Sequence, residues 1–177
     1  RAIQPQWKLM RLSTLVDEVL AVLAPEFERA NVEPLNRISY QLPPIKADPD
    51  MLMRVFSNLC ANALRHTPEG GTVTIDAVQQ ENQLFVSVTD NGEGIPSGAL
   101  TRVFDRFYRA DTSRQAVTGG SGLGLAIVRA IIEAHGGTIW AENVPNSGAR
   151  LVFTLSIASV EQASISGAIT TPMKLIH

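Results

Sequence analysis

Two asparagines and an arginine are the first residues of this chain whose types and spacing could carry out chemistry: Asn58, Asn62 and Arg65. Because they follow one another at intervals of four and three positions, a helix would project all three side chains from one face. An amide oxygen is a hard ligand suited to Mg²⁺, and a guanidinium can pair with phosphate oxygens. On its own, this triad is still more typical of a solvated helix face than of a binding site.

A carboxylate followed by a glycine turn occurs further along, where Asp90 opens the run Asp-Asn-Gly-Glu-Gly-Ile-Pro. Asp90 ends a stretch that is typical of a strand, and there it could accept a hydrogen bond from the exocyclic amine of a base. Such a bond to a charged group contributes about 1.5–3 kcal/mol. Gly92 and Gly94 would let the backbone approach a planar ring. Because Asp-Asn-Gly is also a strong turn former, the motif alone is better explained as a turn.

A second glycine-rich segment, Gly119–Leu125, opens an apolar helix, where free backbone amides can receive phosphate. It is not a dinucleotide fingerprint, because Leu125 stands where the third glycine would fall, and no Gly-Lys-Ser/Thr follows as in a P-loop. The aromatic and basic run Phe104–Arg109 separates the two glycine segments. Together with the asparagine triad, these motifs predict a nucleotide site.

Hydrophobic periodicity predicts the elements that position these groups. Apolar residues four apart indicate an amphipathic helix over residues 13–30, which Pro25 should kink or end. Asp48 as N-cap, with a proline next, predicts the helix Pro49–His66 that carries the triad. Another helix is expected over residues 121–135. Strands are expected at 36–42, 72–78, 83–89, 138–142 and 149–157, with 72–78 and 83–89 as a hairpin, a short helix at 97–103 and a loop at 104–120.

The composition sets limits on the class of protein. A chain of 177 residues with 45% hydrophobic content fits one compact α/β domain, and its net charge of −2 gives no footprint for nucleic acid or an anionic membrane. The single cysteine, Cys60, excludes an internal disulfide and a cysteine metal cluster. The chain begins with Arg1 rather than methionine, which suggests a fragment. We expect residues 1–12 to end a linker, 13–157 to form the domain and 158–177 to be a tail.

In order and spacing, these motifs resemble the catalytic ATP-binding domain of sensor histidine kinases. The matching segments look like the N, G1, F and G2 boxes of that family and are residues 58–68, the Asp90 turn, Phe104–Arg109, Gly120–Leu125 and Glu133–Gly137. The resemblance covers about residues 10–156. It implies an α/β fold, the α+β two-layer sandwich shared with gyrase, Hsp90 and MutL. That fold has a mixed, largely antiparallel sheet of about five strands on about three helices, with a mobile ATP lid.

The resemblance implies metal and phosphate contacts for the asparagine helix. Asn62 would hold Mg²⁺, with Asn58 assisting at the metal or at the phosphates. Arg65 would contact phosphate. His66 stands where the family often has tyrosine, and it would lie beside the nucleotide.

The base and the phosphates would meet the two glycine segments. Asp90 would bind the adenine amine of ATP, in a pocket shaped by Gly92, Gly94 and Ile95. The phosphates would rest on the residues of the second segment, namely Gly120, Ser121, Gly122, Leu123, Gly124 and Leu125.

The segment between them would be the ATP lid, over residues 104–120. Phe104 and Phe107 would anchor it, and Phe107 would also lie against the nucleotide. Arg106 or Arg109 would be available to the γ-phosphate.

Two departures from the family pattern bear on the reaction. Hydrolytic relatives place a glutamate four residues before the metal asparagine to activate water, whereas this chain has Asn58 there. This favours a phosphotransferase, in which positioning and charge neutralisation carry most of the catalysis. At the last strand, Gly148-Ala149 replaces the usual Gly-Thr and Ser156 replaces the usual proline, with little consequence expected.

The phosphoacceptor of the family is a histidine followed by an acidic residue on a separate helical hairpin. None of His66, His135 and His177 fits that pattern. We therefore expect ATP-dependent transfer to a histidine on the protein's own dimerisation domain, in cis or in trans within a homodimer. A response regulator receiver domain would be the next partner. We expect a cytoplasmic domain that contacts neither nucleic acid nor membrane, in a parent that can be an inner-membrane sensor.

Two other interpretations stay open at this point. One is an ATP-hydrolysing relative of the gyrase type, which Asn58 disfavours. The other is a module that binds nucleotide or a partner without catalysis, against which Asn62, Asp90 and the glycine loop argue.

Overall fold

The computed structural model describes residues 3–108 and 123–159. Its elements in chain order are β1 (Lys8–Met10), α1 (Leu12–Ala30), β2 (Glu33–Asn36), β3 (Ile45–Ala47), α2 (Pro49–His66), β4 (Thr72–Gln80), β5 (Gln83–Asp90), the 3₁₀ turn η1 (Ser97–Ala99), α4 (Gly124–Ala134), β6 (Ile139–Asn143) and β7 (Ala149–Ser156).

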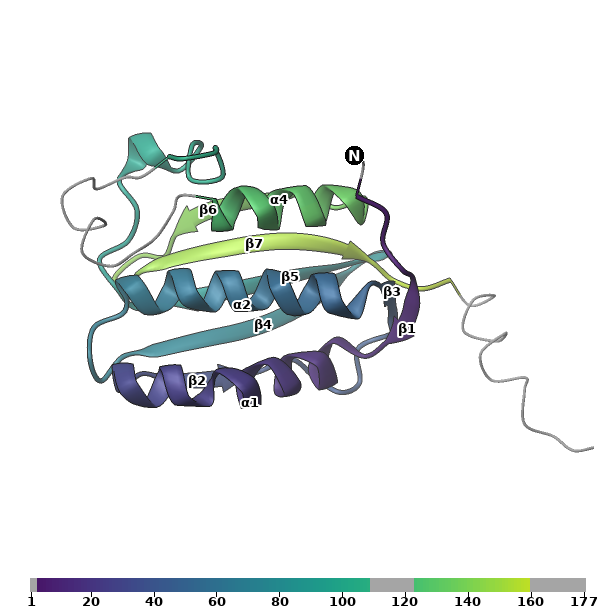
Figure 1. Cartoon of the computed structure of the whole chain (residues 1–177), viewed down its shortest axis with the longest axis horizontal. Coiled ribbons are helices and arrows are strands. Elements are labelled where there is room, and N and C mark those ends of the chain that lie inside the picture. The colour runs from purple at the N-terminus through teal and green to yellow at the C-terminus, as the bar shows by residue number, and fades with distance from the viewer. Residues whose placement is uncertain (1–2, 109–122, 160–177) are drawn as a thin grey trace, which may run out of the picture.

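The main sheet has five strands in the order β2-β4-β5-β7-β6. β2 and β4 pair in parallel, and the other neighbours pair antiparallel. Figure 1 shows α1, α2 and α4 side by side over one face of this sheet. Buried side chains from both layers meet there, for example Phe56 of α2 and Phe153 of β7, whose ring centroids are 5.7 Å apart. The predicted two-layer α/β sandwich with a mixed, largely antiparallel sheet is confirmed.

Helix α2 forms as its local signals predict. The Asp48 carboxylate accepts hydrogen bonds from the backbone N–H groups of Asp50 and Met51, at 3.0 and 3.1 Å, and a proline follows it. This is an N-cap, which supplies partners for two of the amides that a helix start leaves unbonded. One stripe of the helix faces the core, made of Leu52, Val55, Phe56, Leu59, Cys60 and Ala63. Asn58 and Asn62 lie beside the stripe and are half-buried.

In the first part of the chain, one prediction is confirmed and one is wrong. The helix expected over residues 13–30 is confirmed as α1, which continues through Pro25 to Ala30 and buries Phe27 of its last turns in the core, so Pro25 does not end it. The strand expected at 36–42 lies earlier, at Glu33–Asn36. Asn36 ends it, since its side chain donates to the carbonyl of Ser13 and accepts from the N–H of Ile38, which turns the chain.

The chain before α1 is packed against the domain. β1 and β3 form a short antiparallel pair that the sequence did not indicate. The backbone N–H of Gln6 donates to Oδ2 of Asp48 at 2.8 Å, and the Trp7 ring meets His135 edge to face at 5.2 Å. His135 accepts from the N–H of Asp48 through Nε2. Asp48 therefore joins the N-terminal segment, α2 and the end of α4.

The second half of the fold follows the predicted pattern closely. β4 and β5 form the expected hairpin, β6 and β7 complete the sheet, and Asp90 is the last residue of β5. The short helix expected at 97–103 is reduced to η1. The helix expected at 121–135 is described as α4, from Gly124. Across the described residues, no helix has the length and apolar character needed to span a membrane.

Candidate functional site

Asp90 lies at the sheet end with a side chain held in one orientation. The residue is 5% exposed, and its Oδ1 accepts from the N–H groups of Gly92 at 2.9 Å and Ala149 at 3.2 Å. Within residues 3–108 and 123–159, no hydrogen bond ends on Oδ2. Every fully buried side-chain oxygen or nitrogen in those ranges has a partner, so Oδ2 remains accessible. The carboxylate is thus an acceptor with one oxygen fixed and one available.

The turn after Asp90 packs tightly against the end of α2. A Cβ at Gly92 would stand 2.1 Å from the carbonyl oxygen of His66, so only glycine fits. Gly94 has φ +82°, the left-handed region that glycine enters without strain. The two glycines therefore allow close packing within the protein, while their predicted contact with a planar ring stays a prediction. His66 meets the turn with its backbone, and its side chain is exposed.

The β6–β7 turn forms a third side of the site that the sequence motifs did not indicate. A Cβ at Gly148 would lie 2.1 Å from Oδ1 of Asp90 and 2.5 Å from the amide nitrogen of Gly92. Asn143, at the end of β6, hydrogen-bonds the backbone of Ile95. Gly148 gave a signal, because the family pattern has a glycine there, but nothing in the local sequence marks Asn143.

The asparagine face of α2 is brought next to the start of α4. Nδ2 of Asn58 donates to the carbonyl of Gly124 at 3.3 Å, and Nη2 of Arg65 lies 3.4 Å from Oδ1 of Asn62. Leu123, Gly124 and Leu125 are half-buried there. The structure brings these residues together, and their contacts with metal and phosphate stay predictions.

The predicted metal site fits the donors that the structure offers. The described residues contain no group of three or more His, Cys, Asp or Glu side chains that could hold a metal ion. Mg²⁺ needs no such cage, because it keeps several waters and binds through few protein ligands together with phosphates. The amide oxygens of Asn62 and Asn58 are ligands of the right chemistry for that arrangement.

The first part of the predicted lid differs from expectation at one aromatic residue. Phe104 is buried, at 6% exposed, and packs in the core. Phe107 is 70% exposed and has φ +61°, so the second expected anchor is not packed against the domain. Arg106 is also exposed. The remaining predicted contacts at Arg109, Gly120, Ser121 and Gly122 lie outside the described residues.

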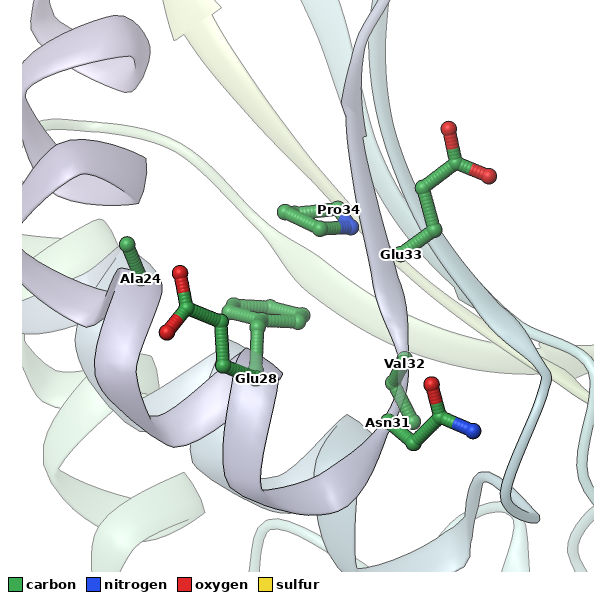
Figure 2. Close-up of a pocket in the computed structure, with 7 residues that line it drawn as sticks. Ala24, Glu28, Asn31, Val32, Glu33 and Pro34 are labelled. Carbon is green, nitrogen blue, oxygen red and sulfur yellow. The ribbon is translucent and has the colours of Figure 1, made fainter.

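A pocket of about 310 Å³ lies elsewhere, between the last turns of α1 and the start of β2 (Figure 2). Its lining residues are Ala24, Phe27, Glu28, Asn31, Val32, Glu33 and Pro34. None of them belongs to the predicted nucleotide site, so this pocket is not its candidate.

A family model agrees with the geometry around Asp90 and α2. The model described as "Histidine kinase-, DNA gyrase B-, and HSP90-like ATPase" matches residues 47–159, which include α2, the Asp90 turn, α4 and the last two strands. The chain belongs to this family. Membership in the histidine kinase-, DNA gyrase B- and HSP90-like ATPases confirms the resemblance inferred from the boxes.

The relatives of this ATPase domain are sensor kinases. It is 46% identical over 113 residues to the sensor histidine kinase WalK of Bacillus subtilis (strain 168), a match that covers 63% of the chain and 18% of WalK. It is 36% identical over 149 residues to the adaptive-response sensory kinase SasA of Synechocystis, which covers 84% of the chain and 38% of SasA. The chain thus spans well under half the length of either relative.

Solved structures show the same fold. The catalytic domain of the histidine kinase ThkA superposes with a TM-score of 0.76 at 27% identity, over 86% of this chain and 96% of that one. Full-length ShkA, crystallised in complex with AMPPNP, superposes with a TM-score of 0.77 at 28% identity, over 90% of this chain and 33% of that one. The chain is therefore an ATP-binding catalytic domain of the histidine kinase type.

Proposed function

We propose that this domain binds ATP with Mg²⁺ between α2, the turn after β5 and the start of α4, and transfers the γ-phosphate to a histidine of a separate dimerisation domain. The observation that carries the proposal is the Asp90 carboxylate. One of its oxygens is fixed by two backbone N–H groups, and the other remains accessible. The turn after it packs against the end of α2, the helix that presents Asn58 and Asn62.

Adenine recognition falls to Asp90. Its Oδ2 accepts a hydrogen bond from the exocyclic amine, and the fixed Oδ1 keeps the carboxylate from rotating away. Because the acceptor is charged, this bond is stronger than one between neutral groups. The neighbouring turn with Gly92, Gly94 and Ile95 lies along the base.

The polyphosphate binds between the facing ends of α2 and α4. Asn62 holds Mg²⁺ through its amide oxygen, with Asn58 assisting, and the ion when bound neutralises charge on the phosphate oxygens. Arg65 lies next to Asn62 and pairs with phosphate. The first backbone amides of α4, which have no carbonyl partner within the helix, point at the same region.

Transfer to a protein histidine is favoured over hydrolysis by the residue at position 58. An amide cannot take a proton from water at neutral pH, and Nδ2 of Asn58 already donates to Gly124. The acceptor imidazole supplies its own nucleophile. Its nitrogen forms a bond to the γ-phosphorus as the bond to the bridging β–γ oxygen breaks, ADP leaves, and the ring proton is released to solvent.

The wider setting follows from the relatives. ThkA has been crystallised in complex with the response regulator protein TrrA, and it shares 26% identity and a TM-score of 0.73 with this chain. We extend this to a response regulator receiver domain as the next phosphate acceptor. The histidine-bearing domain acts in cis or in trans within a homodimer, and the reaction takes place in the cytoplasm.

Calorimetry and labelling test the proposal directly. ATP with Mg²⁺ should bind the chain, and Asp90→Asn should abolish binding because the amide presents a donor where the adenine amine needs an acceptor. Incubation with γ-labelled ATP and the histidine-bearing hairpin of the parent should label the hairpin. Free phosphate without labelled protein would refute the kinase assignment and support a hydrolase, and equal ATP binding by Asp90→Asn would refute the role of Asp90.

A further inference from the structure

We infer that Asn143 is a positioning residue for the adenine-binding turn, and that it sets the preference of the site for an adenine base. The inference rests on the proposed function, because it concerns how well the site holds the base of ATP. We propose no contact between Asn143 and the phosphates, because the phosphates lie against α2 and α4.

Both polar atoms of the Asn143 side chain bond the backbone of a single residue. Oδ1 accepts from the N–H of Ile95 at 2.8 Å, and Nδ2 donates to the carbonyl of Ile95 at 2.7 Å. With one acceptor and one donor, the side-chain amide makes the pair of hydrogen bonds that the backbone of an adjacent strand would make. The peptide units on both sides of Ile95 are thereby held from 48 residues away.

The close approach of Asn143 also depends on the glycine before Ile95. A Cβ at Gly94 would stand 2.9 Å from Oδ1 of Asn143, closer than side chains come without displacement. Gly94 also has φ +82°. The turn therefore takes a shape in which the Asn143 amide can reach over Gly94 to Ile95.

Asn143 belongs to the same rigid frame as the adenine-binding carboxylate. It is the last residue of β6 and pairs with Ala149 of β7. The N–H of Ala149 donates to Oδ1 of Asp90 at 3.2 Å. A closed circuit of contacts thus runs from Asp90 through Ala149 and Asn143 to Ile95, and the chain itself returns from Ile95 to Asp90. The distance between the carboxylate and the turn is set by this circuit.

Loss of the Asn143 amide should act on recognition of the base. Asn143→Ala frees the backbone at Ile95, so the turn no longer holds the base against Asp90. We expect the ratio of the affinities for ATP and inosine triphosphate, which carries a carbonyl in place of the amine, to fall about tenfold. Asn143→Asp keeps the acceptor for the Ile95 N–H and loses the donor, so its affinity ratio should lie between those of the wild type and Asn143→Ala.

The experiment is isothermal calorimetry of the whole chain with each nucleotide and Mg²⁺, together with thermal unfolding. Asn82→Ala is the matched control, because Asn82 is an exposed asparagine in the turn at the opposite end of β5. It should leave the ratio unchanged. A wild-type ratio in Asn143→Ala would overturn the inference, whether affinity for both nucleotides fell together or not at all. If the wild-type chain bound neither nucleotide, the proposed function itself would fail, which is a different outcome.

Discussion

Gly148→Ala should displace the Asp90 carboxylate, which we propose binds adenine, through a single added methyl group. The new Cβ would stand 2.1 Å from Oδ1 of Asp90, 2.5 Å from the amide nitrogen of Gly92 and 2.7 Å from the carbonyl oxygen of Asp90. Ordinary contact begins at 3.4 Å, so the first pair must separate by about 1.3 Å. Gly148 has no left-handed φ, which leaves the steric overlap as the cause of any effect.

The size of the effect follows from the bonds that this movement breaks. Oδ1 of Asp90 accepts from two backbone N–H groups, and a hydrogen bond to a charged group contributes about 1.5–3 kcal/mol. A displacement of more than 1 Å cannot keep both bonds, so we expect a loss of about 2–4 kcal/mol in the free energy of unfolding. If the same movement removes the bond to the adenine amine, ATP affinity should fall about 10- to 100-fold.

Urea unfolding at pH 7 and calorimetry with ATP and Mg²⁺ measure both quantities. Gly98→Ala is the control, because a Cβ at Gly98 meets nothing within 4 Å and Gly98 is not in the left-handed region. It should leave stability and binding unchanged. If Gly148→Ala matched Gly98→Ala in unfolding and bound ATP within about threefold of wild type, the proposed geometry around Asp90 would be wrong.

Three further outcomes can be measured. Burial would raise the pKa of Asp48, but the backbone N–H groups of Gln6, Met51 and Asp50 outweigh it and lower the pKa. Asp48→Ala should therefore cost about 1–2 kcal/mol of unfolding free energy at pH 7. This deficit should shrink as the pH falls from about 3.9, the pKa of the carboxyl in the unfolded chain, through its lower pKa in the folded chain. A deficit that stayed the same at every pH in urea titrations would contradict this. Burial raises the pKa of the Cys60 thiol to about 12, so iodoacetamide at pH 8 should label the thiol in urea but not in the folded chain. Mass spectrometry detects the label, and rapid labelling of the native protein would show that the thiol is not buried. Asn58→Glu places a general base at the position used by hydrolytic relatives, so free-phosphate release from ATP should rise about tenfold or more, and unchanged release would remove position 58 from the explanation.

The parts of the fold that were predictable carry their signals locally. Asp48, the proline after it and one apolar stripe define α2 within a single segment, and the β4–β5 hairpin alternates along its own length. The misplaced strand β2 depends instead on Asn36, whose bonding partners Ser13 and Asp17 lie on α1. The three-residue strands β1 and β3 are too short to show any periodicity.

The candidate site divides in the same way. Asp90 and the asparagine face could be inferred because residue type and spacing are visible in short motifs. Asn143 could not, since its partner Ile95 is 48 residues away and an exposed asparagine near a turn is ordinary. The exposure of Phe107 could not be predicted either, because an aromatic residue in a motif favours burial and does not indicate a left-handed backbone.

Asp48 attaches helix α2 to the N-terminal segment at the end of the helix that lies away from the proposed nucleotide site. The same carboxylate caps the helix and receives the N–H of Gln6 from the segment before α1. At a rise of about 1.5 Å per residue, Asn58 and Asn62 lie about 15 and 21 Å along the axis from that cap. The N-terminal segment is therefore attached at one end of α2, while the two amides that we propose as metal ligands lie toward its other end.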